Sequence, residues 1–114
     1  MSAGTWNILA DEGATFSRVV TWKNSAGALV NLTGYTAKMQ IRESTDSPTV
    51  TLELSTANSK IVLGGALGTI TITAQAADMN FSGRYVHDLE LTSSGGAVTR
   101  LTMGMMIVRP EVTK

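Results

Sequence analysis

The sequence predicts an all-β domain, a sandwich of eight or nine short antiparallel strands, and three observations support that prediction. Apolar and polar residues alternate in at least five separate stretches, which places every second side chain on one face of a sheet. Turns rich in Gly, Asn, Ser and Asp separate these stretches about every ten residues. No stretch of comparable length follows the helical period. A β-sandwich is therefore favoured, and a small barrel is the alternative architecture.

Length and composition limit the function classes. The chain has 114 residues, which is one domain's worth, so we expect a single domain over residues 1–114. Only 16% of the residues are charged and the formal net charge is zero, so no strong field attracts nucleic acid or an anionic membrane. The absence of Cys excludes a disulfide scaffold and a thiolate zinc site. The sequence shows no signal-peptide pattern and no apolar run near the roughly 20 residues of a membrane helix, so we expect synthesis and folding in a cytoplasm.

The N-terminal half contains five expected strands, at residues 6–9, 15–23, 28–30, 35–43 and 49–55. In the second of these, Arg18 interrupts an otherwise apolar face, so that face is expected to be partly buried. Residues 24–27 contain Asn and Gly, which tolerate positive φ, and predict a hairpin-type turn into 28–30. In 35–43 the alternation directs Met39 and Ile41 toward the core and the lysine and arginine side chains away from it.

The C-terminal half contains four expected strands, at residues 61–63, 69–74, 84–92 and 97–108, with one helical turn within 75–81. Matching parity on separate strands predicts one shared core, formed by Met39, Ile41, Leu52, Ile70, Ile72, Leu89 and Leu91. The last strand stops at Pro110, which cannot donate to a ladder. Its two faces are both apolar, with Leu101, Met103, Met105 and Ile107 on one and Val98, Met106 and Val108 on the other. Such a strand is either sandwiched within the fold or covered by another subunit.

No group of residues predicts chemistry. His87 is the only histidine and lies on an apolar strand face, where a core residue with one hydrogen-bond partner is the expected reading. The glycine-rich loop 64–68 precedes a strand, whereas a phosphate-binding loop must open a helix. The acidic pairs Asp11–Glu12 and Asp88 with Glu90 are expected to be solvated surface. We therefore expect no catalytic, cofactor-binding or metal-binding residues, and a protein that is not an enzyme.

Two features predict a partner surface. Met103, Met105 and Met106 cluster in the two-faced strand, and methionine is common at the centres of interfaces, although all three could equally be core residues. Trp6 lies in a short N-terminal strand, which either pairs with a neighbouring molecule or caps its own core. The candidate partner-interface residues are Trp6, Leu101, Met103, Met105 and Ile107.

Several stretches taken together suggest a family: EGATF (12–16), TWK (21–23), LTGYTAKMQIR (32–42), GTITI (68–72), GRYVHDLEL (83–91) and VRPEV (108–112). Their succession resembles small virion proteins of tailed bacteriophages. It is more loosely similar to the N-terminal domain of the upper baseplate proteins of some siphophages. The resemblance covers nearly the whole chain and implies an immunoglobulin-like β-sandwich that serves as an adaptor within the phage particle. It brings no catalytic residues with it.

The expected function is that of a non-enzymatic structural protein of the virion, made in the bacterial host cytoplasm, in the tail or baseplate. It would dock onto identical copies or other virion proteins, as a homo-oligomer or part of a larger assembly, without nucleic acid, membrane or cofactor. One alternative is a capsid decoration protein that cements neighbouring capsomers. Another is a carbohydrate-binding module, which would need exposed aromatic rings in a groove. The available rings are those of Trp6, Phe16, Trp22, Tyr35, Phe81 and Tyr85.

Overall fold

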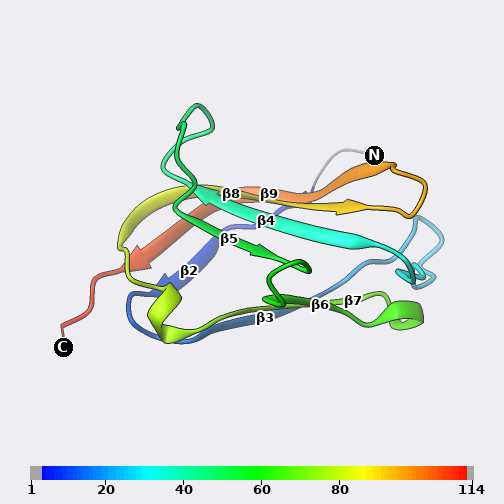
Figure 1. Ribbon diagram of the computed structural model, residues 1–114, viewed down its shortest axis with the longest axis horizontal. Coiled ribbons are helices and arrows are strands. Elements are labelled where there is room, and N and C mark those ends of the chain that lie inside the picture. Colours follow the sequence, from blue (N-terminus) through cyan, green and yellow to red (C-terminus); the bar gives the residue numbers. More distant parts are fainter. Residues whose placement is uncertain (1–3, 113–114) are drawn as a thin grey trace.

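Two β-sheets account for most of the computed structural model, which describes residues 4–112, and they lie one above the other in Figure 1. The larger sheet contains β1 (Gly4–Thr5), β2 (Ile8–Asp11), β4 (Thr36–Arg42), β5 (Leu52–Ser55), β8 (Gly83–Thr92) and β9 (Val98–Arg109). Its order is β1-β9-β8-β4-β5, and β2 also pairs with β9. The smaller sheet contains β3 (Phe16–Thr21), β7 (Thr69–Ala74) and β6 (Ile61–Leu63), in the order β3-β7-β6. The prediction of a nearly all-β chain is confirmed, and the two sheets are compatible with a β-sandwich.

The predicted core is confirmed. Residues at every second position of β4, β7 and β8 point between the sheets, as alternation requires. Six of the seven predicted core residues are fully enclosed, and Leu52 is partly buried against them. Met79 and Leu32, from connecting segments, are also buried in this core. Burial of side chains of this size contributes about 1.5–3 kcal/mol each to folding.

Several element boundaries differ from the prediction. The bounds of β6 and β7 match the expected residues, but the expected strand at 28–30 is reduced to one isolated bridge between Lys23 and Leu29. The expected helical turn within 75–81 is a short 3-10 helix, η2 (Ala76–Asp78). A second one, η1 (Gly65–Leu67), occupies the glycine-rich loop. Of the expected strand at 6–9, only Ile8 and Leu9 are in a strand, β2, while Trp6 and Asn7 lie between β1 and β2.

The prediction that all strands are antiparallel is wrong for β1 and β2. Both run parallel to β9, with Thr5 opposite Met103 and Ile8 opposite Met106. Alternation reports which face a side chain occupies but carries no information on strand direction. This pairing joins segments near opposite ends of the described chain, where no hairpin turn signals it.

A β-bulge changes the faces of β9. Leu89 on β8 lies opposite Thr102 and Glu90 lies opposite Arg100, so Leu101 is an extra residue without a partner. Because one inserted residue reverses the alternation, inward positions are odd before the bulge and even after it. Leu101 therefore packs against the core, and Val98 is exposed. The predicted grouping of Leu101 with Met103, and of Val98 with Met106, is thus wrong.

Candidate docking surface

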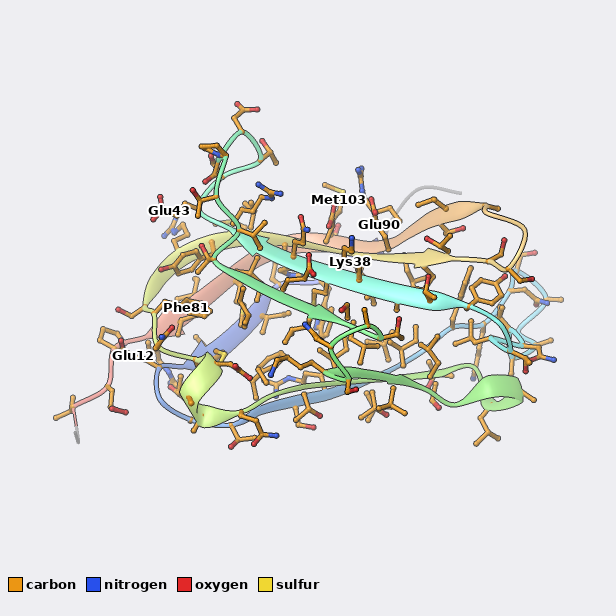
Figure 2. All side chains as sticks on the ribbon, in the orientation of Figure 1. Glu12, Lys38, Glu43, Phe81, Glu90 and Met103 are labelled. Carbon is orange, nitrogen blue, oxygen red and sulfur yellow. The ribbon has the colours of Figure 1, made fainter. Side chains whose placement is uncertain are left out.

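The outer face of the larger sheet carries a continuous apolar patch. Met103, Met105 and Ile107 point away from the core on β9, and their side chains are 46%, 38% and 43% exposed. Leu9, 52% exposed, lies beside Ile107 on β2, and half-buried Val86 lies beside Met105 on β8. Figure 2 shows Met103 on the side of its sheet that faces away from the smaller sheet. These five residues are called the apolar patch below.

The three methionines of the cluster do not share one environment. Met106 and Val108 are enclosed between the sheets, whereas Met103 and Met105 are on the open side of the same strand. No element among residues 4–112 covers that side. A strand that is apolar on both faces therefore buries only one of them within this chain.

Trp6 belongs to the inner side of the sheet and not to the apolar patch. Its backbone N–H donates to the Met103 carbonyl at 2.8 Å, and its ring is partly buried against the core. The ring meets the His87 ring edge-on, with the centroids 5.8 Å apart. Of the two readings of Trp6, packing on its own core is the one found in this structure.

His87 is a core histidine, as expected from its strand face. Its Nε2 donates to the Trp6 carbonyl oxygen at 2.7 Å, because a carbonyl can only accept, and among residues 4–112 its Nδ1 has no hydrogen-bond partner. Burial lowers the pKa of His87 below its ordinary value, and the contact with the Trp6 carbonyl opposes that change. A neutral imidazole that is enclosed in this way holds the N-terminal segment against β8.

A hollow of about 240 Å³ adjoins the apolar patch. Met103 and Val86 line it together with polar residues of β4, β8 and β9, namely Gln40, Arg42, Asp88 and Arg100. Thr45 closes one side of it from the 43–51 loop, which rises above the larger sheet in Figure 1. The outer face is thus concave where the apolar and charged residues meet.

Arginines surround the apolar patch. Arg42 lies opposite Val86 and Arg84 lies opposite Ile107, while Arg100 and Arg109 lie on β9 at either end of the patch. The sequence shows these residues as scattered, and only the neighbouring positions of β4, β8 and β9 bring them together. No periodicity or motif in the sequence could have indicated this cluster.

Two of the four arginines have a carboxylate partner. Arg109 Nε donates to Asp11 Oδ1 at 2.7 Å, which lowers the pKa of Asp11, and Arg100 Nε lies 3.3 Å from Asp88 Oδ2. Arg42 donates to two neutral acceptors, the Ser47 carbonyl at 2.6 Å and Gln40 Oε1 at 3.0 Å. Within residues 4–112, neither Arg42 nor Arg84 forms an ion pair.

Side chains occupy two edges of the sheets. On β5, Asn58 accepts from the Ser55 N–H and donates to the Glu53 carbonyl, both at 2.9 Å, which reproduces the bonds of a further strand. On β2, the Arg18 guanidinium reaches the Leu9 carbonyl at 3.3 Å. Occupied edges disfavour strand addition, so the open outer face is the better docking surface.

Other kinds of site receive no support from the described part of the chain. Residues 4–112 contain no group of three or more His, Asp or Glu side chains placed to hold a metal ion. All six aromatic rings are buried or half-buried, and two pairs pack edge-on, Trp22 with Tyr35 and Phe81 with Tyr85. Within the same residues, no helix has the length and apolar character needed to span a membrane.

No protein-family model matches the chain, and no curated protein matches its sequence.

Proposed function

We propose that this protein is an immunoglobulin-like, non-enzymatic structural component of a tailed-phage particle that docks onto other virion proteins. The phage assignment rests on the sequence resemblance described above. The docking role rests on one structural observation, the exposed apolar patch on β9 and its neighbours. Large exposed apolar side chains that adjoin one another are typical of protein interaction sites.

The strand order supports the immunoglobulin-like part of the proposal. The run β9-β8-β4-β5 has the order of strands G, F, C and C′ of that fold, and β3-β7-β6 has the order of B, E and D. Tyr85 stands near the start of β8, and its hydroxyl donates to the Ser82 carbonyl at 2.8 Å. A tyrosine in this position and with this contact is a recurrent feature of such sandwiches. The Cys pair and the buried Trp of antibody domains have no counterpart in β3, β4 and β8.

The non-enzymatic part is supported by the position of His87. Its side chain is buried, its Nε2 donates to the Trp6 carbonyl, and its ring packs edge-on against the Trp6 ring. The carbohydrate-binding alternative is disfavoured because such modules need exposed rings, and all six rings pack into the fold. Capsid decoration is the second candidate within the virion, because the same apolar patch would serve contact with capsomers.

The proposal is tested on purified particles of the phage that encodes the chain. Mass spectrometry should detect the protein in fixed proportion to the other virion proteins, and a cryo-EM map should place it in the tail or baseplate. A position on the capsid surface would support the decoration role. Absence of the protein from purified particles would refute the virion assignment.

A further inference from the structure

The outer face of the larger sheet carries charges of both signs around the apolar patch. Its basic side chains are Lys38, Arg42, Arg84, Arg100 and Arg109. The acidic side chains of the face and of the 43–51 loop beside it are Asp11, Glu43, Asp46, Glu53, Asp88 and Glu90. The two sets nearly balance, so net charge alone favours neither an acidic nor a basic partner.

These charges are ordered along the strands. On β8 the outward residues run from basic Arg84, through apolar Val86, to acidic Asp88 and Glu90. On the edge strand β5, Glu53 lies level with Asp88, because both residues pair with the same position of β4. The face is therefore basic at one end of β8 and acidic at the other, with the apolar patch between.

Some of the cations are already paired within the chain. Arg100 and Arg109 each lie within ion-pair distance of an aspartate, at 3.3 Å and 2.7 Å. Within residues 4–112, Lys38, Arg42 and Arg84 form no ion pair. These three cations are the ones left to meet carboxylates of a partner.

A loop projects from one end of the same face. The 43–51 loop follows the last residue of β4 and rises above the larger sheet (Figure 1). The Ser47 N–H donates to the Ser44 carbonyl at 3.2 Å, which closes a turn with exposed Asp46 at its centre. The Arg42 guanidinium holds the Ser47 carbonyl at 2.6 Å and so braces the loop against the sheet. The projection is thus supported at its base and acidic at its tip.

A hollow of about 550 Å³ opens at the other end of β4. Lys38 and Glu90 line it together with Thr36 and Thr92, from the outward positions of β4 and β8. Figure 2 shows Glu43 near the loop, and Lys38 and Glu90 farther along the sheet. The face therefore has an acidic projection at one end and a hollow that contains a lysine at the other.

We propose that the outer face binds a second copy of this chain in an antiparallel, face-to-face dimer, with the two-fold axis between the positions of Met103 and Met105 on β9. This inference rests on the proposed docking function and names the partner. It places Met105 of each copy against Met103 of the partner subunit, at the centre of the contact. The two apolar patches then cover each other.

Charge complementarity supports this arrangement. Met105 is paired with Val86, and Met103 with Asp88, so on β8 the axis passes between Val86 and Asp88. Arg84 and Glu90 lie two residues to either side of that pair and face each other across the interface. A partner with one sign of charge would be repelled at one end of the face, whereas a reversed copy meets opposite charge at both ends.

The shape of the face supports the same axis. On β4 the axis passes between Gln40 and Arg42, which pair with Asp88 and Val86 of β8. The 43–51 loop beyond Arg42 of one copy then lies over the hollow of the other, with Asp46 near the partner's Lys38. Because a two-fold interface is isologous, this contact forms twice.

Light scattering of the full chain over a concentration series is the first test. The wild type should form dimers that dissociate on dilution, and Met105→Lys should raise the dissociation constant at least about tenfold. Val62→Lys is the matched control, because Val62 is an exposed apolar residue on the smaller sheet. Urea denaturation of dilute, monomeric samples checks that both variants fold. A wild type that is monomeric up to its solubility limit, or equal dimer formation by the two variants, would overturn the inference.

Exchange of the charges of Asp46 and Lys38 tests the antiparallel arrangement. Both side chains are exposed, and neither forms an ion pair or a side-chain hydrogen bond among the described residues, so their substitution should leave folding unchanged. Asp46→Lys and Lys38→Asp should each weaken the dimer at least about threefold, because each places like charges opposite one another. The double variant should restore the wild-type dissociation constant. Single variants without effect, or a double variant weaker than either, would overturn this arrangement.

Particle composition separates this inference from the proposed function. A wild type that is monomeric in solution, with a different protein over the patch in a cryo-EM map of the particle, would overturn the dimer and leave the virion role intact. A dimer that shows the expected responses to substitution but is absent from purified particles would refute the virion assignment and leave the dimer intact.

Discussion

At the scale of single residues, His87 and Gly104 together determine how the N-terminal segment lies on the larger sheet. They face each other across β8 and β9, and both contact Trp6. A side chain on Gly104 would overlap the Trp6 carbonyl, the group that accepts the His87 hydrogen bond. Both residues therefore serve the same contact, one by its ring and the other by the absence of a side chain.

We predict a stability change with pH that depends on His87. Burial lowers its pKa in the folded state, so between the folded value and the unfolded value near 6.5 the unfolded chain binds more protons. The contribution of neutral His87 to the stability of the fold is fully present above about pH 6.5 and is lost as the pH falls below that value. The slope cannot exceed about 1.4 kcal/mol per pH unit for one group.

Urea unfolding of the wild type and of His87→Gln between pH 7 and pH 5 measures this effect. The free energy of unfolding should decline over this range in the wild type and stay nearly level in the variant. Asp11 and Asp78 have lowered pKa values through their bonds to Arg109 and Lys60, so their contribution is lost only at more acidic pH, near 4 and below. If the free energy of unfolding falls equally with pH in the wild type and in His87→Gln, the pH dependence does not come from His87.

We predict that Gly104→Ala destabilises the protein by about 1–3 kcal/mol, the usual cost of forcing extra atoms into a packed site. Gly104 does not have a positive φ, so the cost is steric and arises from the Trp6 carbonyl. Gly95→Ala is the control, because its nearest neighbour, Ser93 Oγ, would be 3.9 Å from the added carbon. Chemical denaturation compares the two, and equal midpoints would refute the close approach.

At the scale of elements, the edge of β5 is closed by a side chain rather than by another strand. We predict that Asn58→Ala lowers the free energy of unfolding by about 1 kcal/mol, since it removes bonds to Ser55 and Glu53. It should also promote aggregation at high protein concentration, because the edge becomes free to pair. Asn80→Ala, at an exposed position without side-chain hydrogen bonds in the described structure, is the control. Denaturation and light scattering that do not distinguish the two variants would contradict this role.

Alternation predicted the strands of the structure well where one parity runs through the whole strand, and failed where an irregular feature intervenes. The sides of β4, β7 and β8 follow directly from the sequence, because each keeps one parity throughout. The bulge at Leu101 reverses that parity in β9, and a bulge depends on the facing strand, which the sequence of β9 alone does not reveal. The sequence likewise indicated Met103, Met105 and Ile107 but not Leu9, Arg42 or Arg84, which lie in or beside the patch on other strands.

At the scale of the whole molecule, substitutions of Met105 and Met106 separate an effect on docking from an effect on folding, because Met105 is exposed and Met106 is buried. We predict that Met105→Lys unfolds with nearly the wild-type midpoint but fails to enter the particle, because its side chain is already partly in water. Met106→Lys should fail to fold or lose several kcal/mol, because it would place an unpaired charge in the core. Denaturation and incorporation into particles are measured for both. If Met105→Lys unfolds, Met105 belongs to the core and not to the docking surface. If Met105→Lys is incorporated into particles normally, the apolar patch has no role in assembly.

The parallel pairing of β2 with β9 also sets the order of events during synthesis. Asn7 and its partner Met105 are 98 residues apart, and ribosomes add about 5–20 residues per second. Roughly 5–20 s therefore pass between the emergence of the two strands. Throughout that interval Ile8 and Ala10 have no β9 to lie against, and the Trp6 carbonyl has no Gly104 to pack on. The nascent chain can pair β3, β6 and β7 earlier, but the larger sheet gains its β2 edge only after β9 has left the ribosome.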